Sequence, residues 1–173
     1  MSFMPPPPEQ TVLSVHSDKH IISLTGEDVR DFLNDILTAQ INTLASDTAR
    51  AACLLSPQGR ILFDMMVIAT ADTVFLITEA EQAAPLAKRL TMYRLRRKIE
   101  ITVSSNLCAG HIWGEDQANF SVPTSCISAY DERHKALGKL VLFSKTDGLP
   151  KQVEAKYWKA PVSYTHLTLP TMS

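Results

Sequence analysis

Residues 56–68 constrain the fold of this chain more than any other stretch, because a tight turn leads directly into a long apolar run. Pro57 and Gly59 are residues that favour turns. Residues 61–68 are large, apolar and partly β-branched, a pattern that is typical of a buried strand. The small apolar residues 51–55 precede the turn, so we expect the two runs to pair as adjacent strands.

Asp64 is the one charged residue within the apolar run. A carboxylate in such a strand has to be hydrogen-bonded, paired with a cation or protonated, because burying it bare costs several kcal/mol. Asp64 therefore either faces a ligand or lies on an edge strand, where it reaches solvent or caps a neighbouring group. We treat it as the candidate catalytic or binding carboxylate and leave both interpretations open.

The composition is that of an ordinary globular protein of 173 residues, 45% hydrophobic and 20% charged, which allows one good core or two small ones. The formal net charge of -1 gives no overall attraction to nucleic acid or to an anionic membrane, and we expect neither as a direct partner. There is no signal-peptide pattern, and no apolar run approaches the length of a membrane span. Cys53, Cys108 and Cys126 lie far apart, which indicates reduced thiols, argues against a metal site and predicts a cytoplasmic protein.

The N-terminal part begins with residues 1–10, whose four consecutive prolines predict a disordered leader. Residues 11–15 and 20–24 are short β-type runs separated by a polar cluster, and we expect them to form a hairpin. His16 and His20 flank this turn without a cysteine or carboxylate at ligand spacing. We interpret them as surface histidines rather than metal ligands.

An amphipathic helix is predicted after Thr25, which suits an N-cap, with Glu27 and Asp28 in the first turn where the helix dipole favours acids. Apolar residues then recur at the spacing of one helix face. These residues are Val29, Phe32, Leu33, Ile36 and Leu37.

A second helix is predicted from about residue 81 to 97, with Pro85 tolerated in its first turn. Six of the eleven residues 88–98 are basic. They form either a solvated helix end, where the dipole favours cations, or an anion site for a carboxylate- or phosphate-bearing ligand, with Arg94 and Arg96 as fork-shaped donors. The buried stripe of this helix is expected to comprise Ala83, Leu86, Ala87, Leu90 and either Tyr93 or Arg94.

Further strands are predicted at residues 73–78 and 99–103, which completes the order β-β-α-β-β-β-α-β over residues 11–104. This order predicts an α+β fold, with an antiparallel or mixed sheet and two helices packed on one face. Residues 105–160 are expected to form an incomplete second α+β subdomain. Its predicted elements are strands at 109–113, 126–130 and 140–143 and the start of a helix at 153–159.

Several motifs carry a family resemblance. They are Leu24-Thr25-Gly26, Phe32-Leu33 with Thr38, LLSPQGRILFD at residues 54–64 and LTMYRLRRKIEI at residues 90–101. As a set they resemble the N-terminal part of the YgfZ-type folate-binding proteins, relatives of the glycine-cleavage T protein (GcvT, an aminomethyltransferase). The resemblance covers about residues 12–103 and continues more weakly beyond them. It implies a GcvT N-terminal-like fold, tetrahydrofolate as cofactor, and partners among iron-sulfur proteins or their assembly machinery.

The resemblance also implies roles for particular residues. Asp64 falls where the T-protein branch holds the carboxylate near folate N5, and it is a catalytic candidate only. Tyr93 would offer a stacking face, and Arg94, with Arg96 beside it, an anion contact for the folate glutamate tail.

Some segments depart from the family pattern. Thr38-Ala39-Gln40 stands where the family has Thr-Asn-Asp, and Leu33-Asn34-Asp35 where it has Leu-Gln-Gly. Nothing matches the Lys-Gly-Cys-Tyr-x-Gly-Gln loop of the YgfZ branch. Residues 161–173 resemble a translated sequencing adapter, so we set them aside. We therefore expect an N-terminal fragment of a longer protein, with native sequence up to about Ala160.

Three functions remain open. The first is a folate-binding accessory protein of iron-sulfur cluster assembly or repair, and through it of iron-sulfur enzymes that modify tRNA. It is favoured because the Tyr-Arg-Leu-Arg and Pro-Gln-Gly-Arg segments resemble the YgfZ branch more closely. The alternatives are an aminomethyltransferase that moves a one-carbon unit to tetrahydrofolate, and a structural domain without activity.

Overall fold

The computed structural model describes residues 11–114 and 122–145. The predictions made for residues 1–10, 153–159 and 161–173 lie outside these ranges. The elements follow the predicted order. They are β1 (Val12–His16), β2 (Lys19–Thr25), α1 (Val29–Ile36), β3 (Thr48–Leu55), β4 (Ile61–Ala69), β5 (Thr73–Glu79), α2 (Ala80–Tyr93), β6 (Glu100–Ser104), β7 (Leu107–Trp113), β8 (Ile127–Asp131), the 3-10 turn η1 (Lys135–Leu137) and β9 (Lys139–Ser144).

The predicted pairing of the two runs around the Pro-Gln-Gly turn is confirmed. β3 and β4 are antiparallel, with Leu54 opposite Phe63 and a register shift between Leu54 and Leu55. The turn closes through hydrogen bonds from the Ser56 amide to the Arg60 carbonyl and back from Gly59 to Ser56. β5, β2 and β6 extend this first sheet in the order β3-β4-β5-β2-β6.

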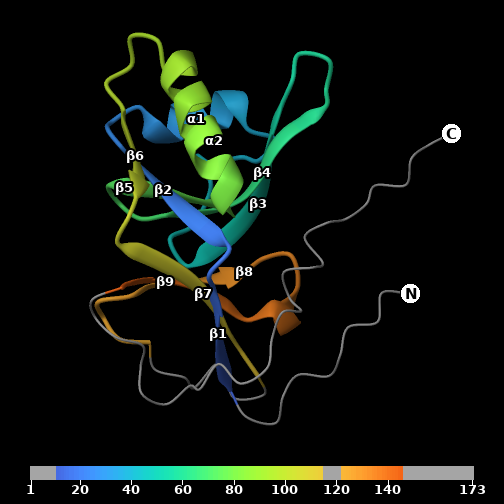
Figure 1. Cartoon of the computed structure of the whole chain (residues 1–173), viewed down its shortest axis with the longest axis vertical. Coiled ribbons are helices and arrows are strands. Elements are labelled where there is room, and N and C mark those ends of the chain that lie inside the picture. The colour runs from blue at the N-terminus through green and yellow to red at the C-terminus, as the bar shows by residue number, and fades with distance from the viewer. Residues whose placement is uncertain (1–10, 115–121, 146–173) are drawn as a thin grey trace, which may run out of the picture.

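Both helices pack on one face of the first sheet, as predicted (Figure 1). The apolar stripe of α1 buries Phe32 and Leu33, and the stripe of α2 buries Leu86 and Leu90. Their side chains join one core with alternate residues of the strands beneath them. No helix within the described ranges has the length and apolar character needed to cross a membrane.

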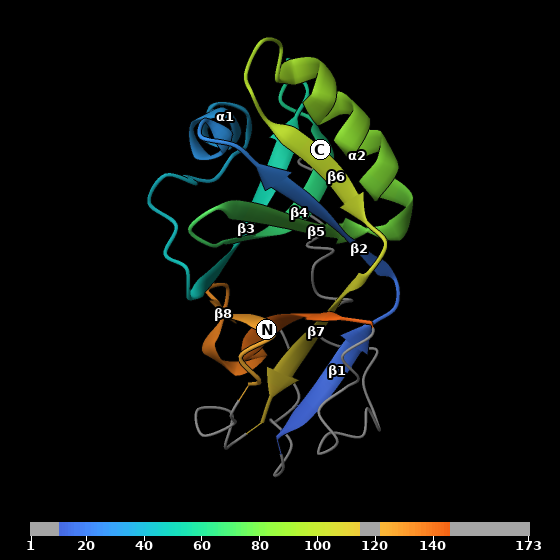
Figure 2. The same ribbon diagram turned by 90° about the vertical axis from the view of Figure 1, so that its left-hand side faces the viewer.

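The opposite face of the first sheet packs against a second sheet, in the order β1-β7-β9-β8 (Figure 2). Met66 and Ile68 of β4 lie in a core with Leu140 and Leu142 of β9. β3 joins the two sheets, because its first residues also pair in parallel with β8. The fold is therefore helices, sheet and sheet in three layers.

The predicted N-terminal hairpin is wrong. β1 pairs with β7 in the second sheet, whereas β2 pairs with β5 and β6 in the first. The polar turn between them carries the chain from one sheet to the other, and the Asp18 carbonyl accepts a hydrogen bond from the Ala80 amide at 2.9 Å. Both strands satisfy their alternating patterns with distant partners, which local sequence does not specify.

Several element boundaries also differ from the prediction. α1 begins at Val29 after Asp28, because Gly26 has φ +134° and holds the preceding residues in a bend. α2 ends at Tyr93 rather than at residue 97. The start of β4 is not buried, since Ile61 is 53% exposed. β6 is an edge strand that leaves Val103 exposed.

Candidate functional site

Asp64 and Cys53 are directly opposite each other on β4 and β3. Side chains alternate along a strand, so Asp64 lies on the same face as Met66 and Ile68, away from the helices. Met66 and Ile68 are covered by the second sheet, whereas Asp64 and Cys53 are half-buried. The pair therefore lies at the edge of the sheet face that the second sheet covers.

The Asp64 carboxylate accepts no hydrogen bond from the residues that the structure describes. Its backbone carbonyl accepts one from the Thr78 hydroxyl at 2.9 Å. Burial, with the nearby charge of Asp64, raises the pKa of the Cys53 thiol, so the thiol stays protonated. The site thus offers an unpartnered acceptor beside a neutral thiol, suited to a ligand with N–H donors.

Two residues from the segments that depart from the family pattern bond backbone groups: Thr38 those of Cys53 in this site, and Asn34 those of the segment that follows α1. Thr38 accepts a hydrogen bond from the Cys53 amide on its hydroxyl at 2.9 Å and donates its own amide to the Cys53 carbonyl. Asn34 accepts the Ile41 amide at 2.9 Å. The sequence interpretation assigned neither residue this role, although Thr38 belongs to a motif that carries the resemblance.

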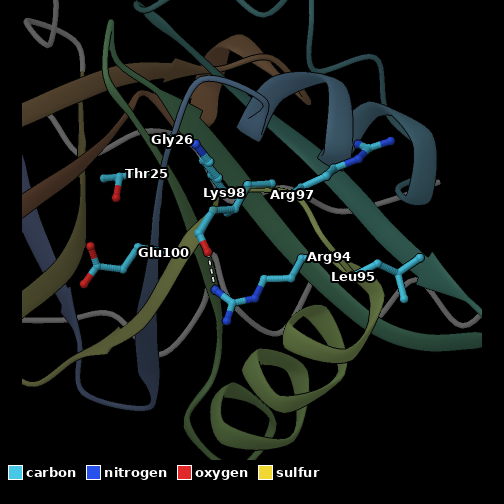
Figure 3. Close-up of a pocket in the computed structure, with 8 residues that line it drawn as sticks. Thr25, Gly26, Arg94, Leu95, Arg97, Lys98 and Glu100 are labelled. Carbon is cyan, nitrogen blue, oxygen red and sulfur yellow. Dashed lines mark hydrogen bonds between the residues drawn. The ribbon is translucent and has the colours of Figure 1, made fainter.

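Arg94 lies at the C-terminal end of α2, and its guanidinium donates a hydrogen bond to the Ile99 carbonyl. It lines an open hollow of about 530 Å³ beside the start of β6 (Figure 3). Arg94 is half-buried and Tyr93 exposed, so Arg94 completes the inward stripe of α2. The hollow is lined by Thr25, Gly26, Arg94, Leu95, Arg97, Lys98, Ile99 and Glu100.

Arg96, the other predicted anion contact, and Tyr93, the predicted stacking residue, lie outside this hollow. Arg96 is exposed and absent from the lining. Tyr93 is 38% exposed, and its hydroxyl accepts a hydrogen bond from Arg89 at 3.3 Å.

Arg97 and Gly26 contribute to the hollow and were not predicted as site residues. Arg97 donates to Asp35 at 2.7 Å, and its guanidinium carbon lies 5.6 Å from the centre of the Phe32 ring. A Cβ on Gly26 would lie 2.3 Å from the Lys98 carbonyl oxygen, so only glycine permits this approach. The basic run and the Leu-Thr-Gly motif were the signals that pointed to these two residues.

The structure does not bring Asp64 together with Tyr93, Arg94 and Arg96. Asp64 contacts Thr78, which pairs with His20 at one end of β2, whereas Thr25 in the hollow ends that strand. Thr25 is five positions further along the strand than His20, which is about 17 Å. The carboxylate and the hollow are therefore two separate candidate sites.

A buried polar chain runs through the second sheet. His16 Nε2 lies 2.7 Å from His111 Nδ1, and His111 Nε2 lies 3.2 Å from Asp131 Oδ2. Arg133 donates to both oxygens of Asp131. The prediction of His16 as a surface residue is wrong, because β1 is covered within the second sheet and leaves His16 6% exposed; His20 is exposed as predicted.

Burial and these contacts shift the pKa values of His16 and Asp131. Burial, with His111 as a neighbour, lowers the pKa of His16 to about 3. Burial alone would raise the pKa of Asp131, but hydrogen bonds from Arg133 and His111 lower it to about 2. Within residues 11–114 and 122–145, no group of three or more His, Cys, Asp or Glu side chains is arranged to hold a metal ion.

Comparison with known proteins gives two kinds of similarity. The chain is 27% identical over 131 residues to the mitochondrial iron-sulfur cluster assembly factor IBA57 homologue of Pyricularia oryzae, covering 72% of this chain and 33% of that protein. The homologue of Chaetomium globosum is 29% identical over 167 residues, covering 78% and 38%, and that of Neurospora crassa is 28% identical over 112 residues, covering 59% and 26%. The chain thus spans about a third of the length of these relatives. No family model matches it.

The fold is similar to the crystal structure of the glycine cleavage system aminomethyltransferase T from Bartonella henselae. The TM-score is 0.64 at 15% identity, and the match covers 79% of this chain and 42% of that one. This likeness shows the α+β fold that the element order predicts. Together the comparisons confirm the resemblance to YgfZ-type, GcvT-like proteins that the sequence motifs indicate.

Proposed function

We propose that this chain is a tetrahydrofolate-binding accessory protein that supports iron-sulfur cluster assembly or repair, and through it iron-sulfur enzymes that modify tRNA. The observation that carries the proposal is the Asp64 carboxylate, half-buried beside Cys53 without a donor among the described residues. The names of the curated relatives, which are iron-sulfur cluster assembly factors, support the assembly role.

The chemistry around Asp64 fits a reduced pterin. A pterin is a flat ring with N–H and amino donors along one edge, and a carboxylate accepts from such an edge. Ala51 shares the face of Asp64, is exposed, and supplies apolar surface for the ring. Tetrahydrofolate would supply a carrier for a one-carbon unit, and Asp64 would hold the ring and influence a proton on its nitrogen.

The contact between a folate tail and Tyr93, Arg94 and Arg96 is a separate proposal. The basic run and the motif match support it, but the distance along the first sheet means that it stands independently of Asp64. Replacing Arg94 and Arg96 by Gln should weaken the binding of a polyglutamated folate more than the binding of a monoglutamate. Equal losses of affinity would contradict a tail contact at these residues.

The test of the Asp64 proposal is an NMR titration of the chain with 5-formyltetrahydrofolate, a stable reduced folate. We expect weak, saturable shifts of the Cys53 and Asp64 amides, because the chain spans about a third of its curated relatives. Asp64→Asn should weaken binding roughly tenfold, which corresponds to about 1.4 kcal/mol.

The matched control is Asp72→Asn, which removes an exposed carboxylate from the turn between β4 and β5. It should leave the folate affinity unchanged. Unsaturable shifts, or equal affinity of Asp64→Asn and the unmodified chain, would overturn the proposed pterin site.

A folate-dependent aminomethyltransferase is the second candidate, and the unpartnered carboxylate in a T-protein-like fold favours it. Transfer of a one-carbon unit from a methylamine-bearing donor to tetrahydrofolate, lost in Asp64→Asn, would select the enzyme over the accessory protein. If the chain neither binds folate nor transfers a one-carbon unit, the remaining interpretation is a structural domain without activity.

We also propose a cytoplasmic location, which the free Cys53, Cys108 and Cys126 support because unpaired thiols suit a reducing compartment. The names of the curated relatives describe mitochondrial proteins. Fractionation of cells that express the tagged chain distinguishes the two locations.

A further inference from the structure

The turn that follows α2 exposes a leucine in a backbone conformation that favours glycine. Leu95 has φ +50° and is 84% exposed. It follows Arg94 at the helix C-cap, the position where a helix commonly carries a left-handed glycine. A side chain with a Cβ is unfavourable there, and one so exposed gains little from packing within the described residues.

Leu95 is not isolated. Met92 is 55% exposed and Tyr93 is 38% exposed, so half of the six large apolar side chains that are exposed in the described ranges fall within these four residues. Met92 lies in the last turn of α2, and Leu95 lies two residues beyond its end. We call residues 92–95 the α2 knob. Exposed apolar clusters of this kind mark contact surfaces more often than scattered single residues do.

The surroundings of the knob are strongly basic. No acidic residue occurs between residues 82 and 99. Arg97 is paired with Asp35 and Arg94 with the Ile99 carbonyl, but neither Arg96 nor Lys98 forms an ion pair with a described residue. Two free cations therefore flank an exposed apolar side chain.

The open hollow adjoins the knob, with Arg94 and Leu95 in its lining. The Arg94 guanidinium reaches the Ile99 carbonyl, and in Figure 3 the Leu95 side chain points away from that of Arg94. Glu100 also lines the hollow, and in Figure 3 it lies on the other side of Arg94 from Leu95. A convex apolar residue beside a concave surface of mixed charge suits an irregular protein surface better than a flat anionic membrane.

We propose that the α2 knob and the hollow form a docking surface for an acidic protein partner. An apolar side chain of the partner packs on Leu95, and its carboxylates pair with Arg96 and Lys98. This surface is independent of the proposed pterin site, because Asp64 lies at the other end of the first sheet.

The test uses NMR titration of the chain with a short peptide of alternating glutamate and leucine. We expect shifts of the amides of residues 92–98 and Gly26, and a loss of affinity of about fivefold in Leu95→Gly. The same variant should raise the Tm by about 2 °C, since glycine accepts the left-handed backbone. A purely structural leucine would lower the Tm when it is removed.

Controls separate the docking surface from general stickiness. Ile61→Ala removes another exposed apolar residue, 53% exposed, and should leave the affinity unchanged, whereas Arg96→Glu with Lys98→Glu should abolish binding. Binding of a lysine and leucine peptide with equal affinity, or of phosphatidylserine vesicles instead of the acidic peptide, would overturn the proposal. So would a Leu95→Gly variant that keeps full affinity.

Discussion

His16 Nε2 lies 2.7 Å from His111 Nδ1, inside a sheet where both imidazoles are almost fully buried. His111 presents its other nitrogen to Asp131 at 3.2 Å. The arrangement is satisfied when both histidines are neutral, with His111 donating from Nε2 to the carboxylate and accepting from His16 at Nδ1. The hydrogen bond between the two rings is therefore already formed when His16 is neutral, so an added proton gains no new partner in His111.

The burial of His16 predicts that the fold loses stability as the pH falls below neutral. The pKa of His16 is lowered from 6.5 to about 3 in the folded state, so the unfolded state binds a proton that the folded state excludes. The free energy of unfolding should fall as the pH drops from 6.5 toward 3, by up to about 5 kcal/mol. Urea unfolding at a series of pH values measures this slope.

His16→Asn keeps an N–H donor but does not titrate, so it should flatten the slope between pH 6.5 and 4. His20→Asn is the control, because His20 is exposed on β2, in the first sheet, and its removal should leave the slope intact. An unchanged slope in His16→Asn would assign the acid sensitivity to other groups.

Arg133→Gln should cost about 3 kcal/mol of stability at pH 7, because it leaves the Asp131 carboxylate buried without a cation. The Asp131 side chain is fully buried and that of Arg133 is 25% exposed. The low pKa of Asp131, about 2, keeps it charged at pH 7. Adding Asp131→Asn to Arg133→Gln should recover part of the loss in chemical unfolding, whereas additive losses would show that the pair is not coupled.

The sequence predicted the element order and the face on which the helices pack, since both depend on local patterns. The apolar spacing of Phe32 and Leu33, and of Leu86 and Leu90, determines which side of each helix is buried. The turn chemistry of Pro57 and Gly59 likewise determines one strand pairing. These signals lie within a few residues of each other along the chain.

The features that the sequence did not predict depend on the pairing of strands that are far apart in the chain. Nothing near β1 indicates that its partner is β7, about a hundred residues later, so the burial of His16 and its contact with His111 were missed. The candidate residues Asp64 and Arg94 were found by chemistry and resemblance, but their separation along the first sheet follows from the register of its strands. Residue type indicates which side chains are candidates for a site, whereas strand pairing and register determine which of them lie close together.

The pairing of Asp64 with Cys53 predicts a change in thiol reactivity. Burial and the carboxylate raise the pKa of Cys53, so Asp64→Asn should lower this pKa and speed alkylation by iodoacetamide at pH 8. The measurement needs Cys108→Ser and Cys126→Ser in the background, so that one thiol reacts. Asp72→Asn should leave the rate unchanged, and a slower reaction in Asp64→Asn would contradict the electrostatic account.

Gly26 and Gly59 provide a matched test of the close approach that shapes the hollow. Both have positive φ, +134° and +81°, so alanine is strained at either position. A Cβ at Gly26 would lie 2.3 Å from the Lys98 carbonyl oxygen, whereas one at Gly59 would meet nothing within 4 Å. We expect Gly59→Ala to cost about 1 kcal/mol, from the backbone alone. Gly26→Ala should cost at least about 3 kcal/mol, because the start of β6 must move as well. Thermal unfolding of the two variants measures the difference, and equal losses would mean that the contact with Lys98 does not constrain this end of the sheet.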